Sequence, residues 1–305
     1  MPEGDTIRRL ADKINRHFAG QRCERCVTRD PRLVGVDLAG AKLVGADAVG
    51  KHLFIRFDNG VTVHSHLRMT GSWTVGPHAH EPEWRRRIEL WMQTGRLTGI
   101  DLPVVEVLAT AREEQVIGHL GPDLCGAELP DLDEVIDRMR RQPTDPLATA
   151  LLDQRNVAGL GNVYAIEVPF IVGVSPNQHV GTIEGLEQIV GLGAALIRTS
   201  AERGPQNTTG RRLNTADHWI YSRRGHPCPL CATTLDGYEE RDSPWRRASV
   251  WCPSCQRLDD TRAGDLARLD RLMALHPARR QPSFPRAEAP ATGPPSESPK
   301  ITDGC

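Results

Sequence analysis

The stretch DQRNVAGLGNVY at residues 153–164 decides how this chain is organised. It predicts the end of one helix, a glycine-containing turn, and a new helix that begins at Asn162. The glycines Gly159 and Gly161 let the backbone come close to a ligand, and a helix start offers unpaired N–H groups to an anion. We therefore expect a helical domain here whose central turn contacts a phosphate. Because Gly-x-Gly turns are common, the rest of the chain must support this interpretation.

The segments on both sides of this turn also have helical patterns. An apolar stripe covers residues 132–139, and a second helix with proline in its first turn ends at Leu152. The helix from Asn162 meets Pro169, which should end or kink it early. A last long helix carries its apolar residues on one side and ends before Gly204.

Towards the N-terminus the pattern changes to a single helix followed by alternation. Apolar residues three or four apart, from Ile7 to Phe18, predict the helix. Alternation then predicts five strands, at residues 42–49, 53–57, 61–67, 88–92 and 104–108. The sequence Asp-Asn-Gly at residues 58–60 predicts a hairpin turn between two of them. Short strands after one helix predict a β-sandwich or a flattened barrel.

The first residues offer a reactive group. Removal of Met1, which is usual before a small second residue, makes Pro2 a free secondary amine directly before the carboxylate of Glu3. Such an amine can attack an electrophilic sugar carbon and form an iminium. Its neutral form is accessible because an α-amino group titrates at about 8, and the positive end of a helix dipole favours that form. Taken alone, Pro-Glu-Gly is also an ordinary chain start.

Two pairs of cysteines predict a metal site. Cys228-x-x-Cys231 and Cys252-x-x-Cys255 are separated by twenty residues, a spacing typical of tetrahedral zinc, in a stretch with few apolar residues. We expect one structural zinc ion, with no open position for catalysis. Cys23-x-x-Cys26 lacks a second half, so a thiol pair in a strand is the better interpretation.

The composition bounds the remaining possibilities. The chain has 305 residues, a net charge of −1 and no apolar run long enough for a membrane span, so we expect a cytoplasmic protein. Several arginine pairs and one arginine triplet still allow local nucleic-acid contacts. We expect three folded units, at residues 1–122, 123–210 and 211–262, and a disordered tail rich in proline and serine at residues 277–305.

The chain resembles the formamidopyrimidine-DNA glycosylase and endonuclease VIII family. The resemblance covers roughly residues 2–258 and rests on the order and spacing of four features: the Pro-Glu-Gly start, Gly50-Lys51 before an apolar strand, the stretch 152–164, and the cysteine pairs with an arginine five residues before the second. It implies an α+β multidomain fold: an N-terminal β-sandwich with a leading helix, a helix-two-turn-helix domain and a C-terminal β-hairpin zinc finger. It also implies a bacterial, nucleoid-associated monomer that binds damaged DNA, double-stranded or single-stranded.

The resemblance implies a role for each matching residue. Pro2 is the expected Schiff-base nucleophile, Glu3 the general acid that opens the sugar ring, and Lys51 a second catalytic cation. Asn162 and Arg247 are expected to clamp the phosphates that flank a flipped nucleotide, and Glu167 matches a helix-borne carboxylate of the DNA-contacting region. The four cysteines would hold zinc.

Two features bear on the substrate. The turn with Arg68 and Met69 lies where the family carries a wedge side chain, although a buried methionine is an equally good interpretation. Residues 102–114 lack the Arg-Phe-Gly of the purine-specific branch, which favours the endonuclease VIII branch and oxidised pyrimidines. We therefore expect a bifunctional DNA glycosylase and abasic-site lyase that cleaves by β,δ-elimination. The alternatives are a purine-excising enzyme and a catalytically silent, zinc-containing binder of damaged DNA.

Overall fold

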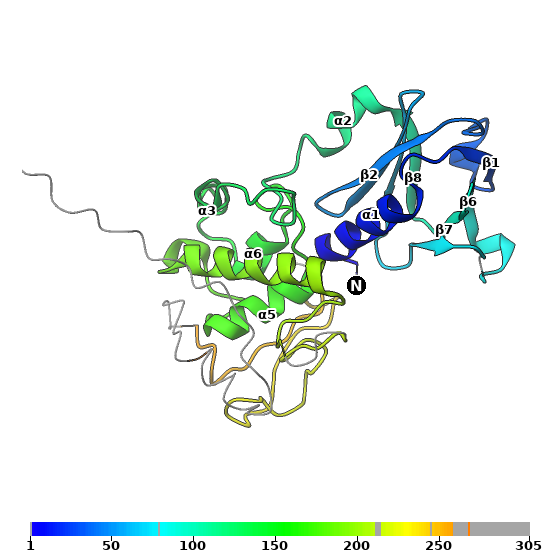
Figure 1. Ribbon diagram of the computed structural model, residues 1–305. Coiled ribbons are helices and arrows are strands. Elements are labelled where there is room, and N and C mark those ends of the chain that lie inside the picture. Colours follow the sequence, from blue (N-terminus) through cyan, green and yellow to red (C-terminus); the bar gives the residue numbers. More distant parts are fainter. Residues whose placement is uncertain (1, 79, 211–214, 245, 259–267, 269–305) are drawn as a thin grey trace, which may run out of the picture.

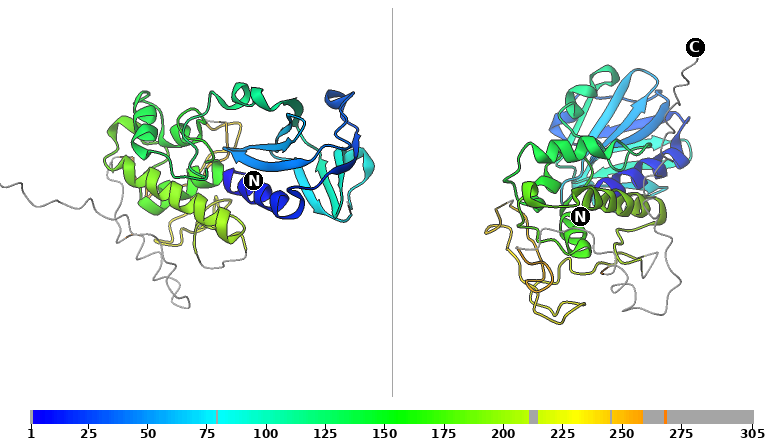
Figure 2. Two further views of the ribbon diagram at one scale, coloured as in Figure 1. Left: turned by 45° about the horizontal axis from the view of Figure 1, so that its top comes forward. Right: turned by 90° about the vertical axis from the view of Figure 1, so that its left-hand side faces the viewer.

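A computed structural model describes residues 2–78, 80–210, 215–244, 246–258 and 268. Met1 and the tail predicted at residues 277–305 lie outside the described residues. Figure 1 shows a β-rich lobe and a mainly helical lobe, with helix α1 (Gly4–Phe18) between them, and the views in Figure 2 agree. Within the described part of the chain, no helix combines the length and apolarity needed to cross a bilayer.

The β-rich lobe is a sandwich of two antiparallel sheets. Its strands are β1 (Cys23–Thr28), β2 (Leu43–Val49), β3 (His52–Phe57), β4 (Val61–His66), β5 (Ser72–Gly76), β6 (Arg86–Met92), β7 (Gly95–Ile100) and β8 (Val104–Ala109). The sheet orders are β1-β6-β7-β5 and β2-β3-β4-β8. The predicted sandwich and all five predicted strands are confirmed. Three strands were not predicted from alternation. Strand β1 was expected only from its cysteine pair, β7 is buried on both faces at nearly every residue, and β5 has no regular alternation.

Helix α1 covers the core of the sandwich with one apolar face. Ile7, Ile14 and Phe18 are each at most 1% exposed and belong to the same core as the strands. Full burial of such a side chain contributes about 1.5–3 kcal/mol. The Asn15 amide also pairs with Ala46 of β2 through both its oxygen, at 2.6 Å from the Ala46 nitrogen, and its nitrogen, at 2.8 Å from the Ala46 oxygen. The start of the chain is therefore fixed to the edge of one sheet.

The helical lobe is built from α3 to α6. The connecting segment carries α2 (Glu114–Ile117), and the lobe contains α3 (Leu132–Arg140), α4 (Leu147–Leu152), α5 (Asn162–Val172) and α6 (Leu186–Arg203). We expected Pro169 to end or kink this helix early. The early end is wrong, because α5 continues to Val172. Pro169 lies in the last turn and removes only one N–H, and the chain leaves the helix at Gly173, whose φ of 86° is left-handed.

The last described segment, residues 215–258, carries the two cysteine pairs. Its described residues form no named helix or strand. Two isolated antiparallel bridges, Pro227 to Thr234 and Asp236 to Trp251, lie where a hairpin was expected. Its few buried apolar side chains, among them Trp219, Leu235 and Val250, join the core of the helical lobe. The segment therefore folds against the helices and around its cysteines.

Candidate functional site

Glu3 lies at the junction of the two lobes and has no exposed surface. Its Oε2 accepts the Gly161 N–H at 2.9 Å, and its Oε1 accepts the Val163 N–H at 2.9 Å. A Cβ at position 161 would lie 2.6 Å from the Glu3 Cδ, so only glycine fits there. The predicted anion at the start of α5 is thus present, but it is the Glu3 carboxylate of the chain itself in place of a phosphate.

The surroundings of Glu3 change its acidity. Burial raises the pKa of Glu3 to about 7, although the charge of Lys51 and the Val163 N–H act in the opposite direction. Lys51 follows Gly50 in the turn between β2 and β3. Burial lowers the pKa of Lys51, the nearby Arg247 charge lowers it further, and Glu3 raises it. An acid that holds its proton near neutral pH is therefore close to a buried amine.

Pro2 directly precedes Glu3 and is half-buried. Figure 1 places this end of the chain where the lobes meet, immediately before the first turn of α1. The Gly4 N–H donates to the Gly159 oxygen at 3.0 Å, which holds the start of α1 against the turn of residues 158–161. The structure thus brings Pro2 and Glu3, predicted from the chain start, to one place with Lys51, which was predicted from a separate stretch.

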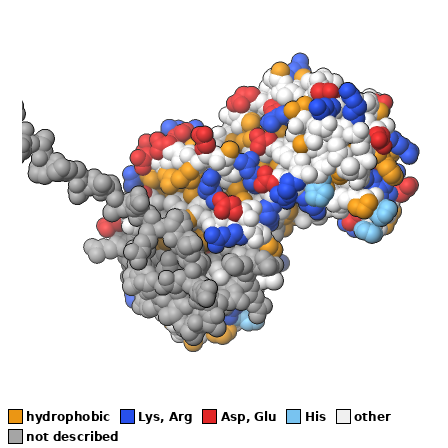
Figure 3. All heavy atoms as spheres, viewed as in Figure 1, with side chains coloured by type: hydrophobic (Ala, Val, Ile, Leu, Met, Phe, Trp, Pro, Cys, Tyr) orange, Lys and Arg blue, Asp and Glu red, His pale blue; other side chains and the backbone are white. Residues whose placement is uncertain are grey.

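Asn162 and Arg247 come together from the helical lobe and the cysteine-bearing segment. The Asn162 Nδ2 donates to the Ala248 oxygen at 2.8 Å, while its buried Oδ1 has no partner among the described residues. The Arg247 side chain is 48% exposed and donates to the Arg246 oxygen at 2.8 Å. Asn162 therefore holds the backbone next to Arg247, whose half-exposed guanidinium lies 3.4 Å from the Glu240 carboxylate and is accessible to a further anion. Figure 3 shows Lys and Arg side chains, with acidic ones among them, where the two lobes meet.

Glu167 is placed differently from the expected DNA contact. It is fully buried in α5, and its carboxylate accepts the N–H groups of Trp219, Ile220 and Tyr221 at 2.7, 2.8 and 2.8 Å. The Thr208 hydroxyl donates to it as well. With four donors and no exposed surface, Glu167 orients the chain around residue 220 and has no free face for DNA.

Arg68 and Met69 lie at an exposed turn between β4 and β5. The Gly71 N–H donates to the Leu67 oxygen at 2.8 Å, and Arg68 has a left-handed φ of 49°. The Met69 side chain is 67% exposed, which is unusual for a large apolar residue. The structure therefore contradicts the interpretation of Met69 as a buried core residue, and it presents an apolar side chain at the tip of a tight turn.

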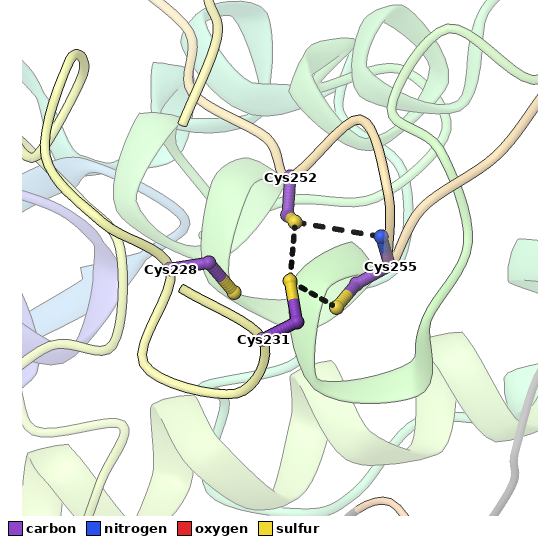
Figure 4. Close-up of side chains that lie close together, drawn as sticks. All are labelled: Cys228, Cys231, Cys252 and Cys255. Atoms are coloured by element: carbon purple, nitrogen blue, oxygen red, sulfur yellow. Dashed lines mark hydrogen bonds between the residues drawn. The ribbon is translucent and has the colours of Figure 1, made fainter. Parts of the chain in front are cut away.

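The four cysteines converge as the spacing predicts. Their sulfur atoms all lie within 4.8 Å of one another, and Figure 4 shows them pointing toward a common centre. The Sγ of Cys231 is 3.5 Å from that of Cys252 and 3.4 Å from that of Cys255. Tetrahedral zinc with Zn–S bonds of about 2.3 Å separates its sulfurs by roughly 3.8 Å. Four thiols at this spacing can hold a metal ion.

The other cysteines among the described residues, Cys23, Cys26 and Cys125, do not join this cluster. Cys23 and Cys26 lie on β1 of the sandwich, and burial raises the pKa of the Cys23 thiol to about 12. The prediction of a thiol pair in a strand thus agrees with their placement.

Sequence reasoning missed three residues of this region. His218 and Tyr221 belong to the segment that Glu167 orients, and their rings meet edge to face with centroids 5.3 Å apart. Asp123, at the start of the helical lobe, accepts the Gly50 N–H at 2.8 Å, one residue before Lys51. No local motif marks these residues, although the turn sequence Leu-Gly-Pro-Asp at residues 120–123 indicated a boundary.

Two family models match the chain. The formamidopyrimidine-DNA glycosylase N-terminal domain matches residues 1–102, and the formamidopyrimidine-DNA glycosylase H2TH domain matches residues 120–203. A solved structure of Lactococcus lactis Fpg (MutM), in a complex with DNA that contains an oxidised pyrimidine, superposes with a TM-score of 0.72 at 20% identity. It covers 84% of this chain and 100% of that chain, and at this identity it shows the shared fold.

Relatives of higher identity carry the assignment further. The probable endonuclease 8 2 of Streptomyces coelicolor is 38% identical over 262 residues, which cover 84% of this chain and 94% of the relative. The DNA-(apurinic or apyrimidinic site) lyase Nei2 of Mycolicibacterium smegmatis is 38% identical over 258 residues, covering 84% and 99%. Since these matches span both lobes and the cysteine-bearing segment, the chain belongs to the formamidopyrimidine-DNA glycosylase and endonuclease VIII family, on its endonuclease VIII branch.

Proposed function

We propose that this chain is a bifunctional DNA glycosylase and abasic-site lyase of base excision repair, which excises oxidised bases, mainly pyrimidines, from damaged DNA. One observation carries the proposal. Pro2 lies beside the buried carboxylate of Glu3, whose pKa is raised to about 7, and the Lys51 charge acts on the same carboxylate. A nucleophilic amine next to a protonated acid is the pair that this reaction needs.

The reaction starts at the sugar. After Met1 is removed, the Pro2 nitrogen attacks C1′, and an N–C1′ bond forms while the bond from C1′ to the base breaks and the base takes the electron pair. The N–H proton of Pro2 passes to the departing base, and the lone pair left on the nitrogen forms the second N–C1′ bond of the iminium when the sugar ring opens. Glu3 then donates its proton to O4′, so that the C1′–O4′ bond opens and its electrons go to the new hydroxyl. Lys51, as a second cation, stabilises the negative charge that develops on the departing base.

Strand cleavage follows from the iminium that results. Because the iminium withdraws electrons, a proton leaves C2′ and the 3′ phosphate is expelled. A second proton loss, at C4′, expels the 5′ phosphate, and water releases the sugar remnant from Pro2. This sequence is β,δ-elimination, with Pro2 as both nucleophile and electron sink.

The remaining site residues hold the DNA. Arg247 and Asn162 bind the phosphates beside the extruded nucleotide, and Met69, with Arg68, fills the gap in the base stack. Glu167 acts indirectly, by orienting residues 219–221. One structural zinc ion bound by the four cysteines would stabilise the segment that carries Arg247; four thiolates leave no position for a reactive water. In this proposal residues 1–122, 123–210 and 211–262 work as three units of a monomer, on double-stranded or single-stranded DNA.

Covalent trapping tests the proposal directly. Borohydride should reduce the iminium and leave the protein joined to DNA that contains an abasic site, and Pro2→Gly should weaken trapping by at least about tenfold. Pro82→Gly, an exposed proline far along the chain, is the matched control and should trap like the parent. A crosslink mapped by mass spectrometry to a lysine side chain, with Pro2 free, would refute the assignment of Pro2.

The substrate class requires a second measurement. Oligonucleotides with thymine glycol, dihydrouracil, 8-oxoguanine or an abasic site, in single and double strands, should be incubated with the protein and their product ends resolved. We expect the two pyrimidine lesions to be excised faster than 8-oxoguanine. Faster release of 8-oxoguanine would favour the purine-excising alternative, and tight binding without any product would favour the silent binder.

A further inference from the structure

The proposed catalytic groups of the sandwich lobe come from two separate segments. Glu3 belongs to the start of α1, whereas Lys51 belongs to the turn between β2 and β3. Both segments contact the helical lobe where Figure 1 shows the lobes meeting. A displacement of about 1 Å between reacting groups can slow an enzyme by about a hundredfold. The contacts that fix the relative position of these two segments are therefore part of the site.

The Asp123 carboxylate makes one of these contacts. Its Oδ2 accepts the Gly50 N–H at 2.8 Å, and its Oδ1 accepts the Cys125 N–H at 2.9 Å. Gly50 has a left-handed φ of 56°, a conformation that glycine adopts without strain. The residue directly before Lys51 is thus bonded across the lobe boundary to the first turn of the helical lobe.

The same stretch is joined to the segment that contacts Glu3. Asp123 forms a parallel bridge with Ala158: the Ala158 N–H donates to the Pro122 oxygen at 2.9 Å, and the Leu124 N–H donates to the Ala158 oxygen at 3.3 Å. The next residue, Gly159, accepts the Gly4 N–H at 3.0 Å. A continuous series of hydrogen bonds therefore runs from Gly50 through Asp123 and residues 158–159 to the start of α1.

The three segments are closely packed where these hydrogen bonds lie. A Cβ on Gly4 would lie 2.9 Å from the Gly159 Cα, and a Cβ on Gly50 would lie 3.2 Å from the Ala158 Cβ. A Cβ on Gly159 would lie 3.2 Å from Oδ1 of Asp123. The three segments therefore pack closely at their glycines, and Asp123 supplies the only side-chain hydrogen bond to Gly50 among the described residues.

We propose that Asp123 is a positioning residue for the reaction. Its carboxylate fixes the Gly50-Lys51 turn to residues 158–159 and so fixes the position of Lys51 relative to Glu3. The inference rests on the roles proposed for Lys51 and Glu3. Asp123 touches neither DNA nor the reacting atoms in this scheme. Its effect on the reaction passes through Lys51.

The test combines a backbone measurement with a double-mutant cycle. In Asp123→Asn one of the two N–H groups faces an amide nitrogen in place of an acceptor, so amide exchange in a peptide containing Gly50, followed by mass spectrometry, should be at least about tenfold faster than in the parent. Borohydride trapping on DNA that contains thymine glycol, where the base must leave before the iminium forms, should slow by about ten- to a hundredfold. In a Lys51→Ala background the same change should slow trapping by less than about threefold, because the residue it positions is gone.

The outcomes separate the inference from the proposed function. Faster Gly50 exchange with non-additive rates supports it, whereas equal losses in both backgrounds, or unchanged exchange, overturn it. If the parent shows no trapping at all, the proposed function fails, while the exchange experiment still reports on the hydrogen bond. Gly50→Ala, which strains the same contact from the other side, should show the same dependence on Lys51 and serves if Asp123→Asn does not fold. Asp47→Asn, on the neighbouring strand, is the control, since its carboxylate binds the side chains of Arg8 and Arg56 and should leave trapping unchanged.

Discussion

The junction around Glu3 and the cysteine-bearing segment at residues 215–258 are stabilised in opposite ways. At the junction, backbone N–H groups, buried carboxylates and glycines from three distant segments interlock, and no single bond dominates. The cysteine-bearing segment, in the part that the structure describes, has no named helix or strand and has a centre made of four thiols. One region is held by many weak contacts, and the other by one strong centre.

This difference predicts how each region responds to a single substitution. A single change at the junction removes a contribution of about 1 kcal/mol per hydrogen bond, so the fold should survive while the geometry of the reaction suffers. With zinc bound by the four cysteines, as proposed above, a single cysteine change should remove the main source of folding free energy of its segment. The two regions should therefore separate loss of activity from loss of structure.

The largest effect is expected at the metal centre. Cys252→Ser should abolish zinc binding, unfold residues around the centre and remove detectable DNA cleavage, because Arg247 is no longer held in place. Metal content by mass spectrometry, with circular dichroism and a cleavage assay, measures all three. Cys26→Ser, on β1 of the sandwich, is the matched control and should keep its zinc and its activity. A Cys252→Ser protein that cleaves normally would show that the centre is dispensable.

The next effect is expected at the junction, without loss of fold. Glu3→Gln keeps the shape of the side chain but cannot donate a proton, so excision of thymine glycol should slow by about 10²–10⁴. Lyase action on a ready-made abasic site should suffer less, because the base has already left. Single-turnover rates on the two substrates give the ratio, with Glu134→Gln, at a half-exposed ion pair, as the control. Equal losses on both substrates would make Glu3 a structural residue.

The pH dependence sharpens the same assignment. Because the pKa of Glu3 is raised to about 7, its protonated fraction falls as pH rises through that value. The neutral fraction of the Pro2 amine increases as pH rises toward the pKa of that amine, about 8. Excision should therefore peak between the two values and fall up to about tenfold per pH unit on either side. In Glu3→Gln the fall at high pH should disappear; a parent rate that keeps rising beyond pH 8 would contradict the role of Glu3 as the acid.

The two regions also differ in how far the sequence predicts them. The convergence of the four cysteines was predictable because they lie in two short motifs whose spacing is typical of zinc ligands. The leading helix and the paired strands were predictable from local periodicity. The partners of Glu3 were not, because Gly161 and Val163 lie some 160 positions away, and only the folded chain brings them to the start of α1.

Helix α5 shows the physical limit of sequence patterns most clearly. All eleven of its residues are buried, so its composition carries no polar face that would tell which side meets DNA. Glu167 was accordingly expected to contact DNA, and the structure gives it four internal donors instead. The start of α5 was expected to bind a phosphate because a helix start has free N–H groups. In the structure the Glu3 carboxylate of the same chain accepts these N–H groups.

The smallest effect separates binding from chemistry within the cysteine-bearing segment. Arg247 is half-exposed and its backbone neighbour Ala248 is held by Asn162, so Arg247→Ala should remove one phosphate contact and leave the metal centre intact. Binding should weaken by about three- to tenfold on all DNA sequences alike, and the slope of log K against log salt should fall by about 0.9. Fluorescence anisotropy titrations at several salt concentrations, beside zinc analysis, measure both. Arg241→Ala, in the same segment and 84% exposed, should change neither quantity. If Arg247→Ala binds as tightly as the parent at every salt concentration, the metal centre does not serve to aim this arginine at the backbone, and the contrast between the two regions loses its functional meaning.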